Sequence, residues 1–308
     1  MNYFDLHADT LTEIKKTDES LYENTCDLDL KRIAQFHGHY GQLFAIWKDR
    51  KLTAEGDPAD EFLFLYRRAL QLLNSENRRI SICRNAEEMQ AAWKLNKGAA
   101  FFSIEDLSLM GNLADRAFSY GIRFVTLTWN YLNEYGCGAV SDQKRGLSEK
   151  GKAAVAEIDR QRMILDVSHL SDQGVEDVCC LTDRPFIASH SNLRAVCGHP
   201  RNLKTEHAKE IMRRKGLIGL NLFAPFVGTA PTLETFRKHL DMMLDLGGEN
   251  AVSIGADFDG SDGRFPQGII GVQSMQELRQ YLADCGYTDS LLEKLFFQNV
   301  KEFMIRNL

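Results

Sequence analysis

The chain has 308 residues, of which 44% are hydrophobic and 26% are charged. This is the composition of an ordinary globular protein, so a fibrous or mainly disordered chain is excluded. The net charge of −6, from 37 basic and 43 acidic residues, argues against nucleic-acid binding through neutralised phosphates. The length allows either two domains of about 150 residues or one larger unit such as an α/β barrel.

No hydrophobic stretch approaches the roughly 18 residues that a membrane helix requires. The N-terminus, MNYFDLHADT, has neither a basic leader nor an apolar segment, and the C-terminus, KEFMIRNL, is not an apolar anchor. The 7 cysteines are odd in number and form no CxxC pair, so we expect reduced thiols. Together these features predict a cytoplasmic protein with no membrane partner.

Short apolar runs alternate along the chain with segments whose apolar residues recur at helical spacing. The predicted strands are residues 3–9, 41–47, 98–106, 122–129, 163–169, 185–191, 216–223 and 251–258. The predicted helices are residues 58–74, 112–119, 148–161, 171–181, 205–214, 232–246, 273–284 and the C-terminal segment. Such alternation predicts parallel βαβ units, and the nearly continuous apolar strands predict a sheet that is covered on both faces.

Eight strand–helix units favour a closed (β/α)8 TIM-type barrel over an open sheet. An open sheet usually binds its ligand beside a glycine-rich first turn, whereas the first turn here, HADTLTE, has no glycine. The sequence also shows no linker that would mark a domain boundary. We therefore expect residues 1–308 to form one α/β barrel domain.

Polar and ionisable residues stand where the predicted strands end. These residues are His7, Asp9, Glu105, Thr128, Trp129, His169, His190, Asn221 and Asp257. Active sites of barrel enzymes form at this end of the strands, with residues from several strands at once. One buried histidine is usually a packed core residue, but so many carboxylates and imidazoles would bury uncompensated charge. The whole set therefore predicts a site whose charges have partners or a metal.

The spacing of these residues suits two metal ions. His7 and Asp9 are two residues apart and point to the same face of their strand, so they can share one divalent cation. His169 and His190 come from neighbouring strands and can hold a second cation, and Glu105 can bridge the two. Imidazole and carboxylate ligands suit borderline metals, with Zn²⁺ as the first choice. Water must complete each metal's coordination shell, as in a dinuclear hydrolase.

Six motifs follow one another over nearly the full length of the chain. They are DLHADT at 5–10, SIED at 103–106, LDVSHLSD at 165–172, ASHSNLRAV at 188–196, HPRN at 199–202 and IGADFDG at 254–260. With these motifs in this order, the chain resembles the renal dipeptidase (membrane dipeptidase) family of dizinc peptidases, which have an amidohydrolase-like barrel. The resemblance implies two zinc ions per chain, a small dipeptide as substrate and a homodimer. It leaves open whether L,D as well as L,L dipeptides are cleaved.

The resemblance also implies a role for each site residue. Its metal ligands are His7, Asp9, Glu105, His169 and His190. The first two would hold one zinc, the two later histidines the other, and the glutamate would bridge them. A hydroxide between the metals would attack the scissile carbonyl, while Asp257 carries the proton to the leaving amine. Arg201 would bind the terminal carboxylate of the substrate through its forked guanidinium.

One position departs from the family. Better-known members carry a histidine shortly after the fourth strand, where this chain has Trp129. That histidine helps to polarise the substrate carbonyl, and removing such a donor typically costs about 2.7–4 kcal/mol. We expect a metal ion, or the nearby Asn130, Asn133 or Tyr135, to take its place. Two alternatives therefore stay open: a non-catalytic metal-binding barrel, and a barrel hydrolase for another amide such as an acyl-amino acid or a lactam.

Overall fold

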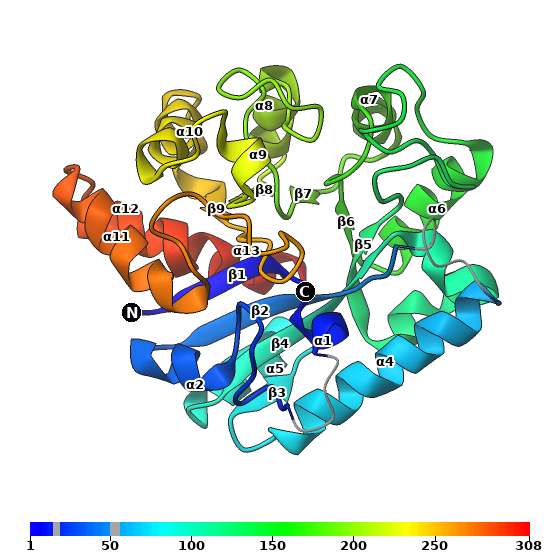
Figure 1. Ribbon diagram of the computed structural model, residues 1–308. Helices are drawn as coiled ribbons and strands as arrows, with labels where there is room; N and C mark the ends of the chain where they lie inside the picture. The colour runs from blue at the N-terminus through cyan, green and yellow to red at the C-terminus, as the bar shows by residue number, and fades with distance from the viewer. Residues whose placement is uncertain (15–18, 50–55) are drawn as a thin grey trace.

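The computed structural model describes residues 1–14, 19–49 and 56–308. Eight parallel strands close into a barrel with helices around it (Figure 1). In order around the barrel they are β1 (Tyr3–Ala8), β2 (Tyr40–Ile46), β4 (Gly98–Glu105), β5 (Ile122–Thr126), β6 (Ile164–Asp166), β7 (Ile187–Ala188), β8 (Leu217–Leu220) and β9 (Val252–Ile254). The barrel closes because β1 pairs with both β2 and β9, and β2 also pairs with β4. The predicted (β/α)8 fold is confirmed, with a strand in each predicted place.

The sequence-based prediction missed one strand and the helix after it. β3 (Ile80–Ile82) pairs with the first residues of β4, and α5 (Ala86–Lys94) follows it. The later residues of β4 pair with β5, while its other edge pairs with β2, so β3 lies outside the closed barrel. It was missed because Ile80–Ile82 is flanked by charged and polar residues, whereas the equally short β6 and β9 lie within longer apolar runs.

The predicted helices are present, and several of them have a capped first turn. The longer helices are α4 (Pro58–Ser75), α6 (Glu149–Arg160), α7 (Asp172–Leu181), α8 (Thr205–Arg213), α10 (Leu233–Asp245), α11 (Met275–Asp284) and α13 (Asn299–Asn307). The short ones are α1 (Thr10–Glu13), α2 (Leu30–Ile33), α9 (Ala224–Val227) and α12 (Asp289–Glu293). The side chains of Asp57, Ser148 and Ser171 each accept a hydrogen bond from a first-turn N–H, which satisfies groups that would otherwise be unpaired.

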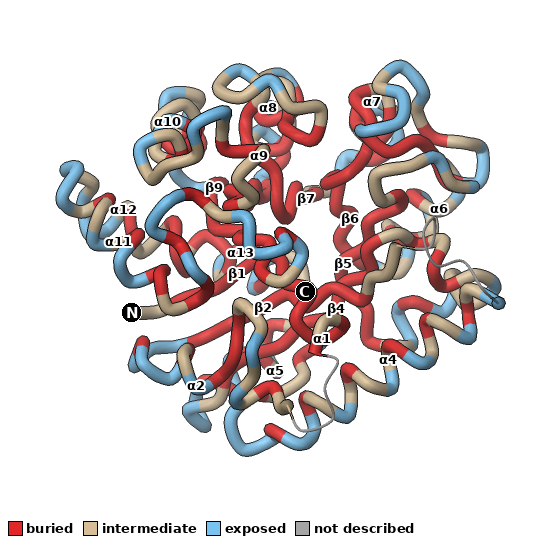
Figure 2. The backbone as a smooth tube through the Cα atoms, viewed as in Figure 1, coloured by how far each residue is buried: buried red, intermediate tan, exposed pale blue. Residues whose placement is uncertain are grey.

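The helix predicted at residues 112–119 belongs to a longer 3₁₀ element, η2 (Leu107–Tyr120), which is broken at Gly111. Gly111 has a φ of 52°, a left-handed value that glycine adopts without steric cost. Figure 2 shows that buried residues follow the strands and that exposed residues lie on the outer helices. No helix in the described ranges is both long and apolar enough to span a membrane.

Two glycines set the spacing between β7, β8 and β9 directly below the predicted site. A Cβ added to Gly219 would lie 1.9 Å from the carbonyl oxygen of Ser189, and one added to Gly255 would lie 1.8 Å from the same oxygen. Ser189 immediately precedes His190. The absence of a side chain at these two positions therefore lets the backbone that carries His190 pack into the barrel.

We expect Gly219→Ala to destabilise the protein by about 1–3 kcal/mol or more, because the added methyl group overlaps backbone that cannot move freely. The measurement is the shift of the urea unfolding midpoint. Gly198→Ala is the matched control, since an added Cβ there meets no described atom within 4 Å. Equal midpoints for the two variants would contradict the expectation.

Candidate metal centre and active site

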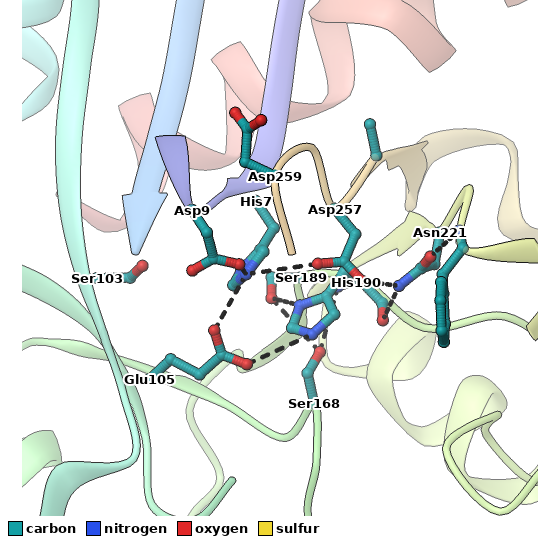
Figure 3. A network of polar contacts seen from close by, with 12 residues as sticks. His7, Asp9, Ser103, Glu105, Ser168, Ser189, His190, Asn221, Asp257 and Asp259 are labelled. Carbon is teal, nitrogen blue, oxygen red and sulfur yellow. Dashed lines mark hydrogen bonds and ion pairs between the residues drawn. The ribbon is translucent and has the colours of Figure 1, made fainter. Parts of the chain in front are cut away.

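The structure brings the five predicted metal ligands together at the carboxyl ends of the barrel strands. β1 carries His7 and leads directly to Asp9, and β4 ends at Glu105. His169 and His190 follow β6 and β7 within three residues. All five side chains are buried. Figure 3 shows His7, Asp9, Glu105 and His190 pointing toward one another above the barrel.

The Glu105 carboxylate lies between the two pairs of ligands. Its Oε2 is 3.1 Å from Nε2 of His7, on the β1 side. Its Oε1 is 2.6 Å from Nε2 of His169 and 3.8 Å from Nε2 of His190. Each oxygen therefore faces a different half of the cluster, which is the placement that a bridging carboxylate needs.

The two later histidines direct the same ring atom at each other. Nε2 of His169 lies 2.8 Å from Nε2 of His190. The other ring nitrogens are occupied: Nδ1 of His169 lies 2.9 Å from Oδ1 of Asn130, and Nδ1 of His190 lies 2.7 Å from Oγ of Ser189. The Asn130 oxygen can only accept, so Nδ1 of His169 donates and its Nε2 presents a lone pair. A cation between the two Nε2 atoms would suit this arrangement.

On the β1 side, two buried polar atoms make no hydrogen bond within the described part of the chain, although one of them lies close to carboxylate oxygens. Nε2 of His7 and Oδ1 of Asp9 have no hydrogen bond to any described residue. Leaving such atoms buried and unpaired is costly, so native proteins rarely do it. Ligand atoms of His7, Asp9 and Glu105 lie within 4.8 Å of one another, as do those of Glu105, His169 and His190. The residues present therefore fit two metal ions that share the glutamate.

Neighbouring carboxylate charges outweigh burial at His7 and raise its pKa well above the usual value. At the two later histidines, burial sets the protonation. It lowers the pKa of His169 to about 3, and the charge of Arg201 acts in the same direction. Burial also lowers the pKa of His190. Both imidazoles are therefore neutral at pH 7, which is the form that binds a metal. Burial, together with the charge of Glu105, raises the pKa of Asp9 to about 7, so a nearby cation would favour its ionised form.

Asp257 lies at the edge of the cluster, three residues after β9. Its Oδ2 accepts a hydrogen bond of 3.0 Å from Nδ2 of Asn221, and its Oδ1 lies 3.9 Å from Nε2 of His7. Burial raises the pKa of Asp257. Asp257 and His169 have φ values of 64° and 71°, which residues other than glycine seldom adopt, so the chain is turned sharply where it presents both side chains.

A cavity of ≈ 320 Å³ opens above these residues, and Arg201 lines it. Arg201 is buried, and burial lowers its pKa to about 10, so the guanidinium is still charged at neutral pH. Its Nη1 lies 3.5 Å from Oγ of Ser191, whereas Nε and Nη2 have no hydrogen-bond partner among the described residues. A buried cation with unused donors beside a cavity is suited to bind a carboxylate.

The three residues that were expected to replace the missing histidine near Trp129 lie in three different surroundings. Asn130 lines the cavity. Nδ2 of Asn133 donates to Oδ1 of Asp106 and to the carbonyl of Leu127, so this side chain holds the loop in place. Tyr135 is placed away from the cavity, contrary to expectation, because its ring packs in a separate pocket with the Lys150 ammonium 4.6 Å from its centre.

Several residues that line the cavity were not predicted. Trp47 follows β2, and its ring centre lies 5.0 Å from that of Trp129. Phe223 and Phe226 follow β8 and form the wall beside Arg201. Trp47 and Phe223 end predicted strands, which was a usable signal, whereas Phe226 lies in α9, a short helix that the sequence analysis did not predict.

A barrel whose strand ends collect imidazoles and carboxylates under a cavity with a buried, partly unpaired guanidinium defines a class, the metal-dependent hydrolases. The family model of membrane dipeptidase (peptidase family M19) matches residues 1–304. The chain therefore belongs to the membrane dipeptidase family, and the resemblance found in the sequence is confirmed.

Solved structures and curated relatives agree with this family. A metallo peptidase from Rhodobacter sphaeroides, liganded with a phosphinate mimic of L-Ala-D-Ala, is 26% identical with a TM-score of 0.87 and covers 100% of this chain and 99% of its own. Dipeptidase AC of family M19 is 27% identical with a TM-score of 0.88, covering 100% and 98%. Dipeptidase aclJ of Aspergillus oryzae is 32% identical over 61% of this chain and 46% of its own. These comparisons favour a dipeptidase over the two alternatives, a non-catalytic metal-binding barrel and a barrel hydrolase for another amide.

We expect Asn130→Ala to weaken metal binding by roughly 10- to 100-fold, because His169 then loses the acceptor that fixes its tautomer. The measurement is competition with a chromophoric chelator for Zn²⁺. Asn130→Asp keeps an acceptor oxygen at this place and should retain most of the affinity. Identical affinities for the wild type and Asn130→Ala would show that the hydrogen bond does not orient the ligand.

Proposed function

We propose that this chain is a dinuclear zinc dipeptidase in which residues 1–308 act as one catalytic domain. The observation that carries the proposal is the Glu105 carboxylate, whose two oxygens face two separate sets of nitrogen and oxygen ligands. The proposed ligands and Asp257 come from both halves of the chain, so a division near residue 150 would leave neither half with the whole site. A dipeptide substrate is supported by the dipeptide mimic bound to the Rhodobacter sphaeroides relative.

The roles of the metal ligands follow from their grouping. His7, Asp9 and Glu105 would hold one ion, and Glu105 with the two later histidines would hold the other. Imidazole nitrogens mixed with carboxylate oxygens are ligands that Zn²⁺ commonly takes. When bound, the two ions lower the pKa of a water molecule and draw electron density from the scissile carbonyl.

Asp257 is the proposed proton carrier. It takes the proton of the attacking water and gives it to the nitrogen of the leaving amine, so one water is consumed for each bond cleaved. Its Oδ2 is held by Asn221, which leaves Oδ1, on the side of His7, for the proton. The raised pKa caused by burial suits this task, because a carboxylate that must both accept and release a proton works better when it is less acidic.

Arg201 is the proposed binding site for the C-terminal carboxylate of the substrate. Two of its donor atoms are unpaired and buried, so a carboxylate oxygen would replace no existing protein contact. The guanidinium stays charged because its pKa remains far above 7. Binding at this place limits the leaving group to a single residue with a free carboxylate.

We expect the zinc-loaded protein to contain two ions per chain and Glu105→Gln to lose at least one of them, together with most of the dipeptidase activity. Metal content is measured by elemental analysis after gel filtration, and activity by amino-acid release. Glu134→Gln is the control, since this exposed carboxylate pairs with Lys150 far from the cluster. Wild-type protein with one ion or none at saturating zinc would contradict the dinuclear centre.

We expect C-terminal amidation of a dipeptide, or Arg201→Lys, to lower kcat/KM by roughly 10- to 100-fold, because charged hydrogen bonds contribute about 1.5–3 kcal/mol. The amidated substrate should lose little further activity in the variant, since both changes remove the same contact. Steady-state kinetics on paired free and amidated dipeptides measures this. Equal cleavage of the two by the wild type would remove Arg201 from the proposal.

A further inference from the structure

A second cavity, of ≈ 430 Å³, adjoins the one above the metal ligands. We call it the outer cavity and the first one the catalytic cavity. The outer cavity is lined by residues that include Lys48, Asp106, Tyr131, Leu132 and Ser141. Among the described residues, Trp129 is the one that lines both cavities.

The wall between the two cavities is thin. Trp47 lines the catalytic cavity while the next residue, Lys48, lines the outer one. In the same way, Glu105 and Val140 line the catalytic cavity, while the residues that follow them, Asp106 and Ser141, line the outer one. Three backbone segments thus run between the cavities, and the side chain of Trp129 fills the space that they leave.

Ring contacts place the indole of Trp129 in this wall. On the catalytic side its centre lies 5.0 Å from the Trp47 ring and 6.0 Å from the His169 ring. On the outer side it lies 5.3 Å from the ring of Tyr131. Trp129 is half-buried, as expected for a residue that lines two cavities.

Arg201 belongs to the opposite wall of the catalytic cavity. Its guanidinium lies 5.4 Å from the centre of the Phe226 ring, in the loops after β7 and β8. Trp47 and Trp129 follow β2 and β5, and Glu105 on β4 lies between those two strands in the barrel. A dipeptide with its carboxylate at Arg201 and its peptide bond over Glu105 would extend its amino-terminal residue toward the part of the cavity that Trp47 and Trp129 line.

We propose that Trp129 is the specificity-determining residue that sets the amino-terminal limit of the substrate. Its indole packs against the amino-terminal residue and closes the outer cavity to anything attached beyond it, such as an acyl group or a third amino acid. The proposal rests on the proposed function, because it takes Arg201 as the carboxylate site. Removing the indole joins the two cavities and admits these longer substrates, whose last amide bond is hydrolysed with uptake of one water.

The test compares the wild type with Trp129→Ala on Ala-Ala, Phe-Ala, N-acetyl-Ala-Ala and Ala-Ala-Ala, all with zinc. Products are identified by mass spectrometry, and each kcat/KM is divided by that of Ala-Ala for the same protein. We expect this ratio to rise about tenfold or more for the three larger substrates in Trp129→Ala, in the range that a change of pocket size produces. Trp129→Phe keeps a ring in the wall and should stay closer to the wild type.

Leu132→Ala is the matched control, since this half-exposed side chain lines the outer cavity and not the catalytic one. It should keep the wild-type ratios. The inference is overturned if folded, zinc-loaded Trp129→Ala keeps the wild-type ratios or is inactive on every substrate. If the alanine variant does not fold, unchanged ratios in Trp129→Leu overturn it instead. A wild type that cleaves no dipeptide overturns the proposed function, and this inference with it.

Discussion

The site depends on one electrostatic constraint, the burial of several ionisable groups within a few ångströms of one another. His169 and His190 face each other through the same ring nitrogen at 2.8 Å, and burial keeps both neutral. Asp9 and Glu105 are buried close enough for the charge of one to raise the pKa of the other. Imidazole nitrogens and carboxylates buried this close together are stabilised when cations lie between them. The need for metal thus follows from how the whole set is buried and not from any one residue.

Two buried aspartates hold the backbone that presents these ligands, in the same way on two sides of the barrel. Oδ1 of Asp5 accepts from the N–H of His7 on its own strand and from that of Ala256 after β9, at 3.0 Å each. Oδ1 of Asp166 accepts from the N–H of Ser168 at 2.9 Å and from that of Ser189 at 3.0 Å. Each carboxylate ties two neighbouring strands together beside a histidine ligand. The candidate metal ligands are therefore presented from backbone that these two carboxylates tie together.

The sequence predicted site residues best at the ends of strands, because a strand determines the direction in which its side chains point. A side chain at the end of a parallel strand has little choice about where it points, so His7, Glu105 and Asp257 could be assigned to one site before any coordinates. Loop residues lack this constraint: Tyr135 was expected at the cavity, but packing with Lys150 turns it away. A cavity wall shared by segments far apart in sequence, such as the one around Trp129, depends on tertiary contacts that no local pattern encodes.

The candidate metal ligands and the cavity wall also differ in how readily their residues can be replaced. The ligands compensate one another's burial, so replacing one leaves the others with unpaired charge or lone pairs. Trp129 takes no part in this balance, because its indole contacts the rings of Trp47, Tyr131 and His169 without ligating anything. Substitution at this position therefore changes the shape of the cavity without removing a candidate metal ligand.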